Sequence, residues 1–271
     1  MAKKTQKPET RPRATKATER LETISNLLNK NERVDVNELA SLFTVTIETV
    51  RRDLIKLENG GLIGRVHGGA VLRAPGFLKV QAPTASERSM LRVKEKVAIG
   101  LAALNYMPHG GVVIFDAGTT VLELARRVPV DCSPTIVSMG LPAALELSYR
   151  GFQSVLVTGG EVNPKTFASG GEWALRILEE LSADVAFVGV SGVSLERGFT
   201  TSSHLDALMK QAILSAARQK IVLADSSKIE AVFTSKICNI DEIDVLITNA
   251  DANPKIVSRL QKSGIEVVLA E

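Results

Sequence analysis

Residues 45–54 read VTIETVRRDL, and this stretch decides the fold of the first part of the chain. Thr46 is a good N-cap for a helix that runs to about residue 58. Apolar residues recur on one side of this helix at helical spacing, namely Val50, Leu54 and Leu57. The stretch therefore predicts a short helix with one buried stripe and a polar face that carries two adjacent arginines.

Two further helices are predicted before this one, and a hairpin after it. From Thr18 apolar residues recur three and four positions apart, which predicts the first helix. Residues 34–36 predict a short extended link, and Asn37 is a good N-cap for a second helix over residues 38–43. Residues 62–72 predict a small hairpin. Three helices followed by a hairpin form the winged helix-turn-helix arrangement, which binds DNA.

The polar face of the third helix is where such a domain meets base edges and phosphates. The residues that we expect to contact DNA are Thr46, Glu48, Thr49, Arg51, Arg52, Lys56, Arg65 and His67. The alternative interpretation is an ordinary helical hairpin with a solvated charged face. DNA binding is favoured because the helices, the turn, the hairpin and a basic N-terminal arm all agree with it.

Charge is distributed unevenly along the chain, although its formal net charge is only +3. Residues 1–73 hold 14 Lys and Arg against 9 Asp and Glu, whereas residues 74–271 hold 19 against 21. Residues 1–16 are rich in Lys, Arg, Thr and Pro, which predicts a disordered arm. The basic end is the part that we expect to bind a polyanion.

The composition indicates a globular protein, with 45% hydrophobic and 23% charged residues. No stretch approaches the roughly 18 apolar residues that span a bilayer, and no secretory signal is expected at the N-terminus. Cys132 and Cys238 stand in no metal or redox spacing, so we expect neither a disulfide scaffold nor a metal site. We expect a cytoplasmic protein without a membrane partner.

Four segments follow from these patterns: a basic arm (1–16), a winged helix-turn-helix domain (17–73), a linker (74–90) and an α/β domain (91–271). The α/β domain should begin with one helix over residues 88–107. Short apolar strands and helices should then alternate, which predicts a mostly parallel sheet covered on both faces. The expected strands are 112–116, 135–138, 154–158, 185–190, 220–224, 245–248 and 266–269. The expected helices between them are 119–127, 141–149, 172–181, about 205–218, and 254–262.

Ligands of such sheets bind beyond the carboxyl ends of the strands, and four of these ends carry small and polar residues here. Backbone N–H groups and two hydroxyls at a helix start, as in residues 116–120, suit a phosphate or sulfate, although a plain helix cap explains them equally well. Lys228 could neutralise an anion, but a lone lysine after a strand is usually solvated. The candidate effector-binding residues are Asp116, Gly118, Thr119, Thr120, Gly159, Gly160, Ser191, Thr200, Thr201 and Lys228. Neither a phosphate-binding GxxxxGK motif nor a dinucleotide fingerprint is present.

Both halves of the sequence resemble one family. Residues 45–54 with 65–70, and residues 116–120, 184–190, Lys210 and 224–228, are similar to the DeoR-type bacterial transcription regulators. The resemblance implies a sensor domain related to ribose-5-phosphate isomerase and CoA-transferase folds. It also implies a phosphorylated sugar or related metabolite as effector, self-association into dimers or tetramers, double-stranded operator DNA as partner, and no other cofactor. The protein is then expected to be a repressor of a sugar-metabolism operon.

Three positions depart from the family pattern. Thr46 stands where the family usually has Ser, which keeps the hydroxyl. Ser138-Met139 replaces Thr-Asn, and Gly171-Glu172 replaces Gly-Pro. Met139 lacks the polar group that would contact a ligand, so the identity of the effector stays open.

The alternative function is a sugar-phosphate isomerase or transferase with an accessory DNA-binding-like domain. Isomerisation through an enediol needs a positioned base, normally a carboxylate. Ribose-5-phosphate isomerases resemble residues 184–192 but carry an acidic cluster where this chain has Val188, Ser191 and Gly192. We therefore expect a sensor without catalytic residues.

Overall fold

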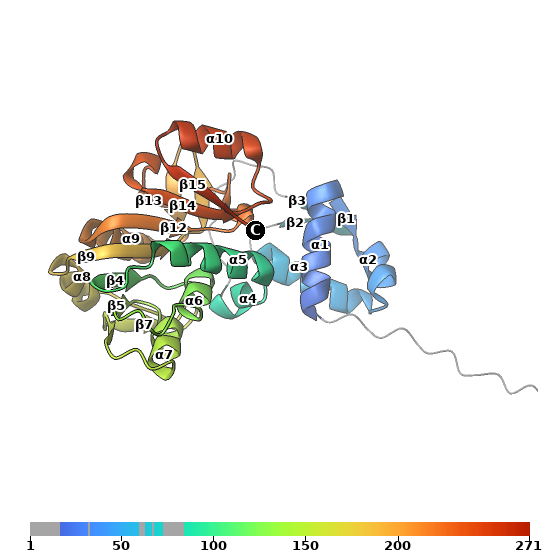
Figure 1. Ribbon diagram of the computed structural model, residues 1–271. Helices are drawn as coiled ribbons and strands as arrows, with labels where there is room; N and C mark the ends of the chain where they lie inside the picture. The colour runs from blue at the N-terminus through green and yellow to red at the C-terminus, as the bar shows by residue number, and fades with distance from the viewer. Residues whose placement is uncertain (1–16, 32, 60–62, 67, 73–83) are drawn as a thin grey trace, which may run out of the picture. The chain divides into compact units, whose positions relative to one another are not determined.

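The computed structural model describes residues 17–31, 33–59, 63–66, 68–72 and 84–271 (Figure 1). The chain divides into two units, residues 1–73 and 74–271. The expected arm and the expected linker up to residue 83 lie outside the described residues. No described helix is long and apolar enough to cross a membrane.

The first unit has the predicted winged helix-turn-helix fold. Its helices are α1 (Ala17–Asn31), α2 (Val36–Phe43) and α3 (Ile47–Asn59), and its strands are β1 (Arg33–Asp35), β2 (Ile63–Val66) and β3 (Gly69–Leu72). The strands form an antiparallel sheet in the order β1-β3-β2. The predicted stripe of α3 is confirmed, because Val50, Leu54 and Leu57 are all buried.

The start of α2 differs from the prediction. Asp35, and not Asn37, caps this helix: its Oδ1 accepts the backbone N–H of Asn37 at 2.7 Å and that of Glu38 at 3.3 Å. The expected extended link is the strand β1, which pairs with β3. Strand pairing holds Asp35 in the extended conformation that an N-cap needs, so the cap falls at the end of the strand.

The second unit contains the predicted parallel sheet. Its seven strands run in the order β15-β14-β12-β9-β4-β5-β6, and all neighbours are parallel. The strands are β4 (Val112–Phe115), β5 (Thr135–Ser138), β6 (Val155–Val157), β9 (Ala183–Gly189), β12 (Ala217–Leu223), β14 (Val245–Asn249) and β15 (Glu266–Ala270). Their carboxyl ends therefore meet at one edge of the sheet, as predicted.

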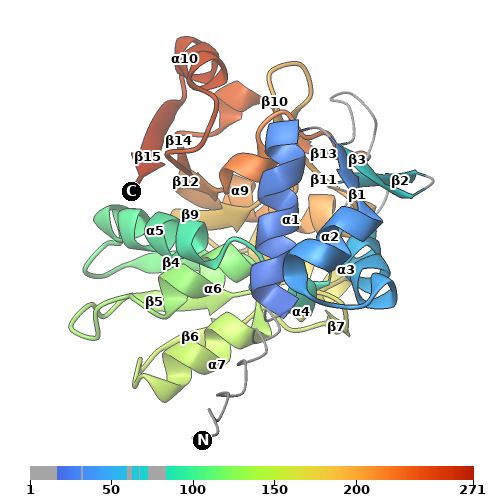
Figure 2. The same cartoon turned by 90° about the vertical axis from the view of Figure 1, so that its right-hand side faces the viewer.

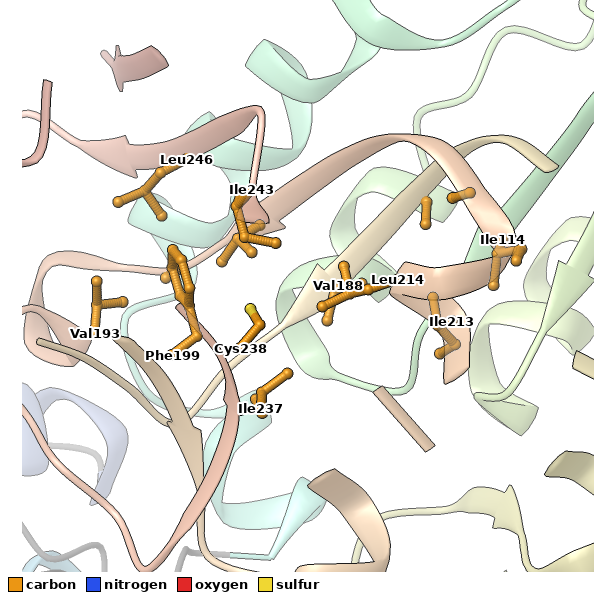
Figure 3. Packing of buried hydrophobic residues seen from close by; sticks show 14 of the residues in the cluster. Ile114, Val188, Val193, Phe199, Ile213, Leu214, Ile237, Cys238, Ile243 and Leu246 are labelled. Atoms are coloured by element: carbon orange, nitrogen blue, oxygen red, sulfur yellow. The ribbon is translucent and has the colours of Figure 1, made fainter. Parts of the chain in front are cut away.

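Helices cover both faces of this sheet. Side chains of α5 (Val93–Ala103), α6 (Thr119–Ala125) and α7 (Leu141–Tyr149) belong to one buried cluster, and α5 and α6 lie side by side (Figure 2). Side chains of α8 (Glu172–Glu179), α9 (His204–Ala216) and α10 (Pro254–Lys262) belong to the other. Figure 3 shows part of this second cluster, including Ile213 and Leu214 of α9. Neighbouring residues of β4 alternate between the clusters, since Val113 and Phe115 face one and Ile114 the other.

Two small antiparallel sheets were not predicted from the sequence. One is the hairpin of β7 (Glu161–Asn163) and β8 (Ala168–Gly170), and the other joins β10 (Gly192–Ser194), β11 (Gly198–Thr201) and β13 (Ser235–Cys238). Short 3₁₀ turns complete the unit at Leu104–Tyr106, Ser226–Lys228 and Ile240–Glu242. The hairpin needs glycine at position 160, because a Cβ there would lie 2.1 Å from the carbonyl oxygen of Gly170.

The helix predicted over residues 88–107 is interrupted. A separate helix α4 (Ala85–Ser89) precedes α5, and Arg92 between them adopts a left-handed backbone with φ of 50°. Thr84 caps α4 in a reciprocal capping box with Glu87. The described end of the expected linker is thus a short helix that belongs to the second unit.

Candidate functional site

The candidate DNA-binding face of α3 is accessible. The side chains of Glu48, Arg51, Arg52 and Lys56 are exposed, as is that of Thr46 just before the helix, and Thr49 is half-buried. Thr46 caps the helix as predicted: its Oγ1 accepts the backbone N–H of Thr49 at 3.2 Å. Arg65 lies in β2, but its side chain and the whole of His67 lie outside the described residues. These two predicted contacts stay predictions.

A buried ion pair fixes α3 against α1. Arg20 donates from Nε to Oδ2 of Asp53 at 2.8 Å, and both side chains are less than a tenth exposed. Arg51, by contrast, lies 3.8 Å from Glu48 with both side chains about two-thirds exposed, so this contact is weak. The arginines of the exposed face are therefore free to bind another partner, while Asp53 of the same motif has a structural role.

Asp116 is the centre of a polar network at the carboxyl edge of the sheet. Its fully buried Oδ2 accepts the ammonium of Lys210 from α9 and the backbone N–H of Gly189, the latter at 2.9 Å. Lys210 also lies 3.4 Å from Asp206, whose carboxylate accepts the hydroxyl of Thr201 at 2.6 Å. Burial lowers the pKa of Lys210, but the two carboxylates outweigh it and the net pKa is raised. Lys210 is thus held as a cation.

Asp225, which follows β12, is the centre of a second charged group at the same edge of the sheet. Its Oδ1 accepts the backbone N–H of Ser227 at 3.0 Å and lies 3.7 Å from Nε of Arg92. Burial raises the pKa of Asp225, but Lys228, the Ser227 hydroxyl, Arg92 and Lys96 outweigh it, so the carboxylate stays charged. Burial lowers the pKa of Lys228, and the positive charges of Arg88 and Arg92 lower it too, which outweighs the carboxylate of Asp225 that raises it.

Arg88 connects these two groups electrostatically. Its guanidinium interacts with Asp206 and Asp116 on one side and with Lys228 on the other. Nearby, Lys96 is buried and donates from Nζ to the carbonyl of Leu91 at 2.6 Å and to that of Arg88. Burial lowers the pKa of Lys96 to about 8. Two cationic side chains at the strand ends, those of Arg88 and Lys228, therefore lie near carboxylates but make no hydrogen bond to them.

Gly118 and Thr119, at the start of α6, are half-buried, whereas Asp116, Ala117 and Thr120 beside them are buried. Gly118, and not a threonine, is the N-cap of α6, and no side chain of the described residues caps that helix. A Cβ at Gly118 would meet nothing within 4 Å. The hydroxyls of Thr119 and Thr120 have no hydrogen-bond partner in the described parts of the chain. A plain threonine cap, which was the alternative interpretation, is not present.

Other predicted effector residues have structural roles. Thr200 is fully buried, and its Oγ1 accepts the backbone N–H of Phe233 at 3.0 Å and donates to the carbonyl of Gly192. Gly160 serves the β7–β8 hairpin, whereas Gly159 has φ of 72° and open space around it. Thr201 holds Asp206, and Ser191 Oγ lies 3.4 Å from the hydroxyl of Thr201. We therefore leave Thr200 and Gly160 out of the candidate site.

Two of the positions that depart from the family pattern, Met139 and Glu172, have no polar role in the candidate site. Met139 is buried in the core that it shares with Val137 and Met209, so its side chain packs rather than facing a ligand. Glu172 is exposed and pairs with Arg176 one turn later on α8 at 2.5 Å.

Sequence reasoning missed three residues of the charged cluster, namely Arg88, Arg92 and Asp206. It used Lys96 and Lys210 only for their resemblance to the family. Arg88 falls in the segment that composition marks as linker, which hides it. The sequence signal that could have revealed these residues is weak, because an isolated charge on a helix is usually solvated.

Comparison with known proteins decides the family. The profile of the DeoR-like helix-turn-helix domain matches residues 20–75, and that of the DeoR C terminal sensor domain matches residues 91–250. The chain belongs to the DeoR family. The HTH-type transcriptional regulator GolR of Listeria innocua is 31% identical to this regulator over 253 residues, which cover 93% of this chain and 98% of that protein.

Two other relatives are named as repressors. The putative aga operon transcriptional repressor of Escherichia coli O157:H7 is 31% identical over 95% of each chain. The HTH-type transcriptional repressor GlcR of Bacillus subtilis is 31% identical over 93% of this regulator and 96% of that protein. The regulator is therefore a DNA-binding transcription regulator, and its interpretation as an isomerase or transferase is wrong.

Solved structures of lower similarity include ribose 5-phosphate isomerase A of Methanocaldococcus jannaschii. It shares 16% identity over 49% of this regulator and 53% of that chain, with a TM-score of 0.37.

No group of three or more potential metal ligands occurs among the residues that the structure describes.

Proposed function

We propose that the regulator represses a sugar-metabolism operon in the cytoplasm and that a phosphorylated sugar or related metabolite modulates its binding to operator DNA. The observation that carries this proposal is the pair of cations Arg88 and Lys228 at the carboxyl edge of the sheet. The positive charge of Arg88 lowers the pKa of Lys228, and Nε of Arg88 is buried without a hydrogen bond to any described residue. A bound phosphate group relieves this repulsion between the two cations and supplies the missing acceptor.

The remaining contacts of the effector follow from the positions of the neighbouring groups. The hydroxyls of Thr119 and Thr120 and the open backbone at Gly118 suit the phosphate oxygens. Asp116 accepts hydrogen bonds only, which suits the hydroxyls of a sugar. The names of the aga operon repressor and GlcR support a repressor of sugar genes.

The effector proposal predicts that Thr119→Val removes the response to phosphorylated sugars. The two side chains have the same shape, so the folded state should persist while one hydrogen bond to a charged group is lost, which corresponds to roughly 10-fold weaker binding or more. Thermal shift and calorimetry with glucose 6-phosphate, fructose 6-phosphate and ribose 5-phosphate measure this, with the free sugars as blanks.

Thr135→Val is the matched control, because Thr135 begins β5 at the opposite edge of the sheet. DNA binding without effector should be unchanged in both variants. A Thr119→Val protein that binds the phosphorylated sugars as tightly as the wild type contradicts the proposed role of the loop. A wild-type protein that binds none of the three contradicts the phosphorylated effector.

The DNA-binding proposal predicts a smaller salt dependence when Arg51 or Arg52 is replaced by alanine. Each phosphate contact that is lost lowers the slope of log K against log salt concentration by about 0.9. Fluorescence anisotropy at several salt concentrations, with a duplex selected by the protein from a random library, measures the slope. Arg259→Ala removes an equal charge from the exposed face of α10 and should leave the slope unchanged. An unaltered slope in Arg51→Ala and Arg52→Ala rules out the docking of α3 on DNA.

We also propose that the regulator acts as a dimer or tetramer, as the family resemblance implies. A second copy of the chain is the partner that we expect on α8, where Trp173 is 74% exposed and Ile177, one turn later, is 46% exposed. A symmetric dimer also matches the paired half-sites of typical operators. Light scattering on the samples used above measures the mass in solution.

A further inference from the structure

The segment from Thr84 to Arg92 is built into the effector site, although in sequence it is the end of the connection between the two units. Its first helical residue, Ala85, donates its backbone N–H to the carbonyl of Lys165 in the β7–β8 hairpin at 2.6 Å. Its C-terminal end is held by Lys96, which donates to the carbonyls of Arg88 and Leu91. The segment also contacts α6, the helix that begins at Thr119 just after Asp116. Arg88 therefore sits on a short piece of backbone that is hydrogen-bonded to the sensor unit near both of its ends in this arrangement.

Two buried polar atoms at this place lack partners. Nε of Arg88 is shut off from solvent and has no hydrogen bond, and the same holds for Oδ1 of the fully buried Asp116. The two side chains interact electrostatically. Buried polar groups in native proteins are nearly always hydrogen-bonded, and a charged group without partners is the most costly exception.

A hydroxyl group has the chemistry that both atoms lack, because it donates one hydrogen bond, as Oδ1 of Asp116 requires, and accepts others, as the N–H of Arg88 requires. The same guanidinium has further N–H groups for an anionic oxygen, and Lys228 supplies a second cation on that side. A polyhydroxylated phosphate ester carries both kinds of group.

We propose that Arg88 contacts the effector and that, through Arg88, effector binding is coupled to the position of helix α4 and hence to DNA binding. The proposal rests on the proposed function and adds the residue that transmits the signal. A ligand shifts an equilibrium only by its differential affinity for the two states. Arg88 provides this difference, because the effector gains the contact only in the arrangement in which α4 lies against the site. Residues 73–83 join α4 in sequence to the DNA-binding unit.

The experiment measures the affinity for the tightest-binding of the three sugar phosphates, with and without a saturating amount of the selected DNA duplex. In the wild type the two affinities should differ by about 5- to 150-fold, the usual range of allosteric coupling. In Arg88→Met the affinity of the free protein should fall about 10- to 100-fold, which corresponds to the loss of a charged hydrogen bond. The ratio of the two affinities should fall to near one.

Arg88→Lys is the second variant, because it keeps the charge and the long stem but loses the planar fork and Nε. It should also weaken binding and reduce the coupling, with DNA affinity in the absence of sugar phosphate unchanged. Arg197→Met, on the exposed turn between β10 and β11, is the matched control and should leave both quantities at their wild-type values.

The outcomes separate the two proposals. Unchanged sugar-phosphate affinity in the variants that fold overturns the contact. Weaker binding with the wild-type coupling ratio overturns the role of Arg88 in transmission. Loss of both binding and coupling supports the proposal. A wild-type protein whose sugar-phosphate affinity is the same with and without DNA contradicts the proposed function itself, whatever the Arg88 variants do.

Discussion

Asp53→Ala is expected to destabilise the DNA-binding unit by about 3–5 kcal/mol, because it breaks the buried ion pair between Asp53 and the guanidinium of Arg20. A domain of this size is stable by only about 5–15 kcal/mol, so the change removes a large part of the total. Since Asp53 lies on α3, the loss of its carboxylate also loosens the helix that carries the candidate DNA-contacting residues. We expect the variant to lose operator binding through unfolding and not through a missing DNA contact.

Hydrogen exchange followed by mass spectrometry tests this prediction peptide by peptide. Residues 17–59 should exchange faster in Asp53→Ala, whereas residues 84–271 should keep the wild-type rates. Glu48→Ala is the matched control on the same helix, because its contact with Arg51 is largely exposed and is worth about 0–1 kcal/mol. The role of the buried pair is excluded if the two variants exchange alike.

Lys210→Met is expected to destabilise the sensor unit by a similar amount, about 3–5 kcal/mol near neutral pH, because it removes the cation that is ion-paired with the buried carboxylate of Asp116. Burial already raises the pKa of Asp116 in the wild type, and loss of Lys210 raises it further. A carboxyl group whose pKa is higher in the folded state binds more protons there than in the unfolded chain. Its folded form is therefore favoured at low pH and penalised as pH rises above the unfolded value of about 3.9.

The difference in unfolding free energy between wild type and Lys210→Met should accordingly be large at pH 8 and smaller at pH 5. Urea unfolding at the two pH values measures it. Adding Asp116→Asn to Lys210→Met removes the buried negative charge and should restore part of the stability and abolish the pH dependence. Lys262→Met on the exposed face of α10 controls for the loss of a positive charge. A deficit that is equal at both pH values contradicts the assignment to Asp116.

The two halves of the molecule differ in how far their functional residues could be predicted from sequence. On α3 the same periodicity that identifies the buried stripe also identifies the exposed face, because a helix surface is defined by residues three and four apart. The DNA-contacting candidates that the structure describes therefore lie where they were predicted. The role of Asp53 was not predicted, because its partner Arg20 lies 33 residues away in sequence.

In the sensor unit, patterns among neighbouring residues predicted the polar loops at the strand ends. They did not predict which charged side chains meet between those loops. The parallel arrangement brings the ends of β4, β6, β9 and β12 to one edge, as the alternation of strands and helices implies. Thr200, however, stands in a polar stretch with several hydroxyls, so the sequence predicts a loop residue. In the structure its side chain is fully buried. Its place in the β10-β11-β13 sheet depends on pairing with residues 235–238, which no short-range pattern encodes.

The sequence by itself determined the division into a winged helix-turn-helix and a parallel α/β unit, together with the exposed polar face of α3. These features depend on hydrophobic periodicity, capping and turn residues, and all three act over a few positions in the chain. Only the tertiary structure decided that Lys210 neutralises Asp116 from 94 residues away, and that Arg88 interacts with Asp116 and Asp206 although it falls in the segment expected as linker. The physical reason is that the state of a buried charge is set by the partners that surround it in space, and the chain brings those partners together only when it folds.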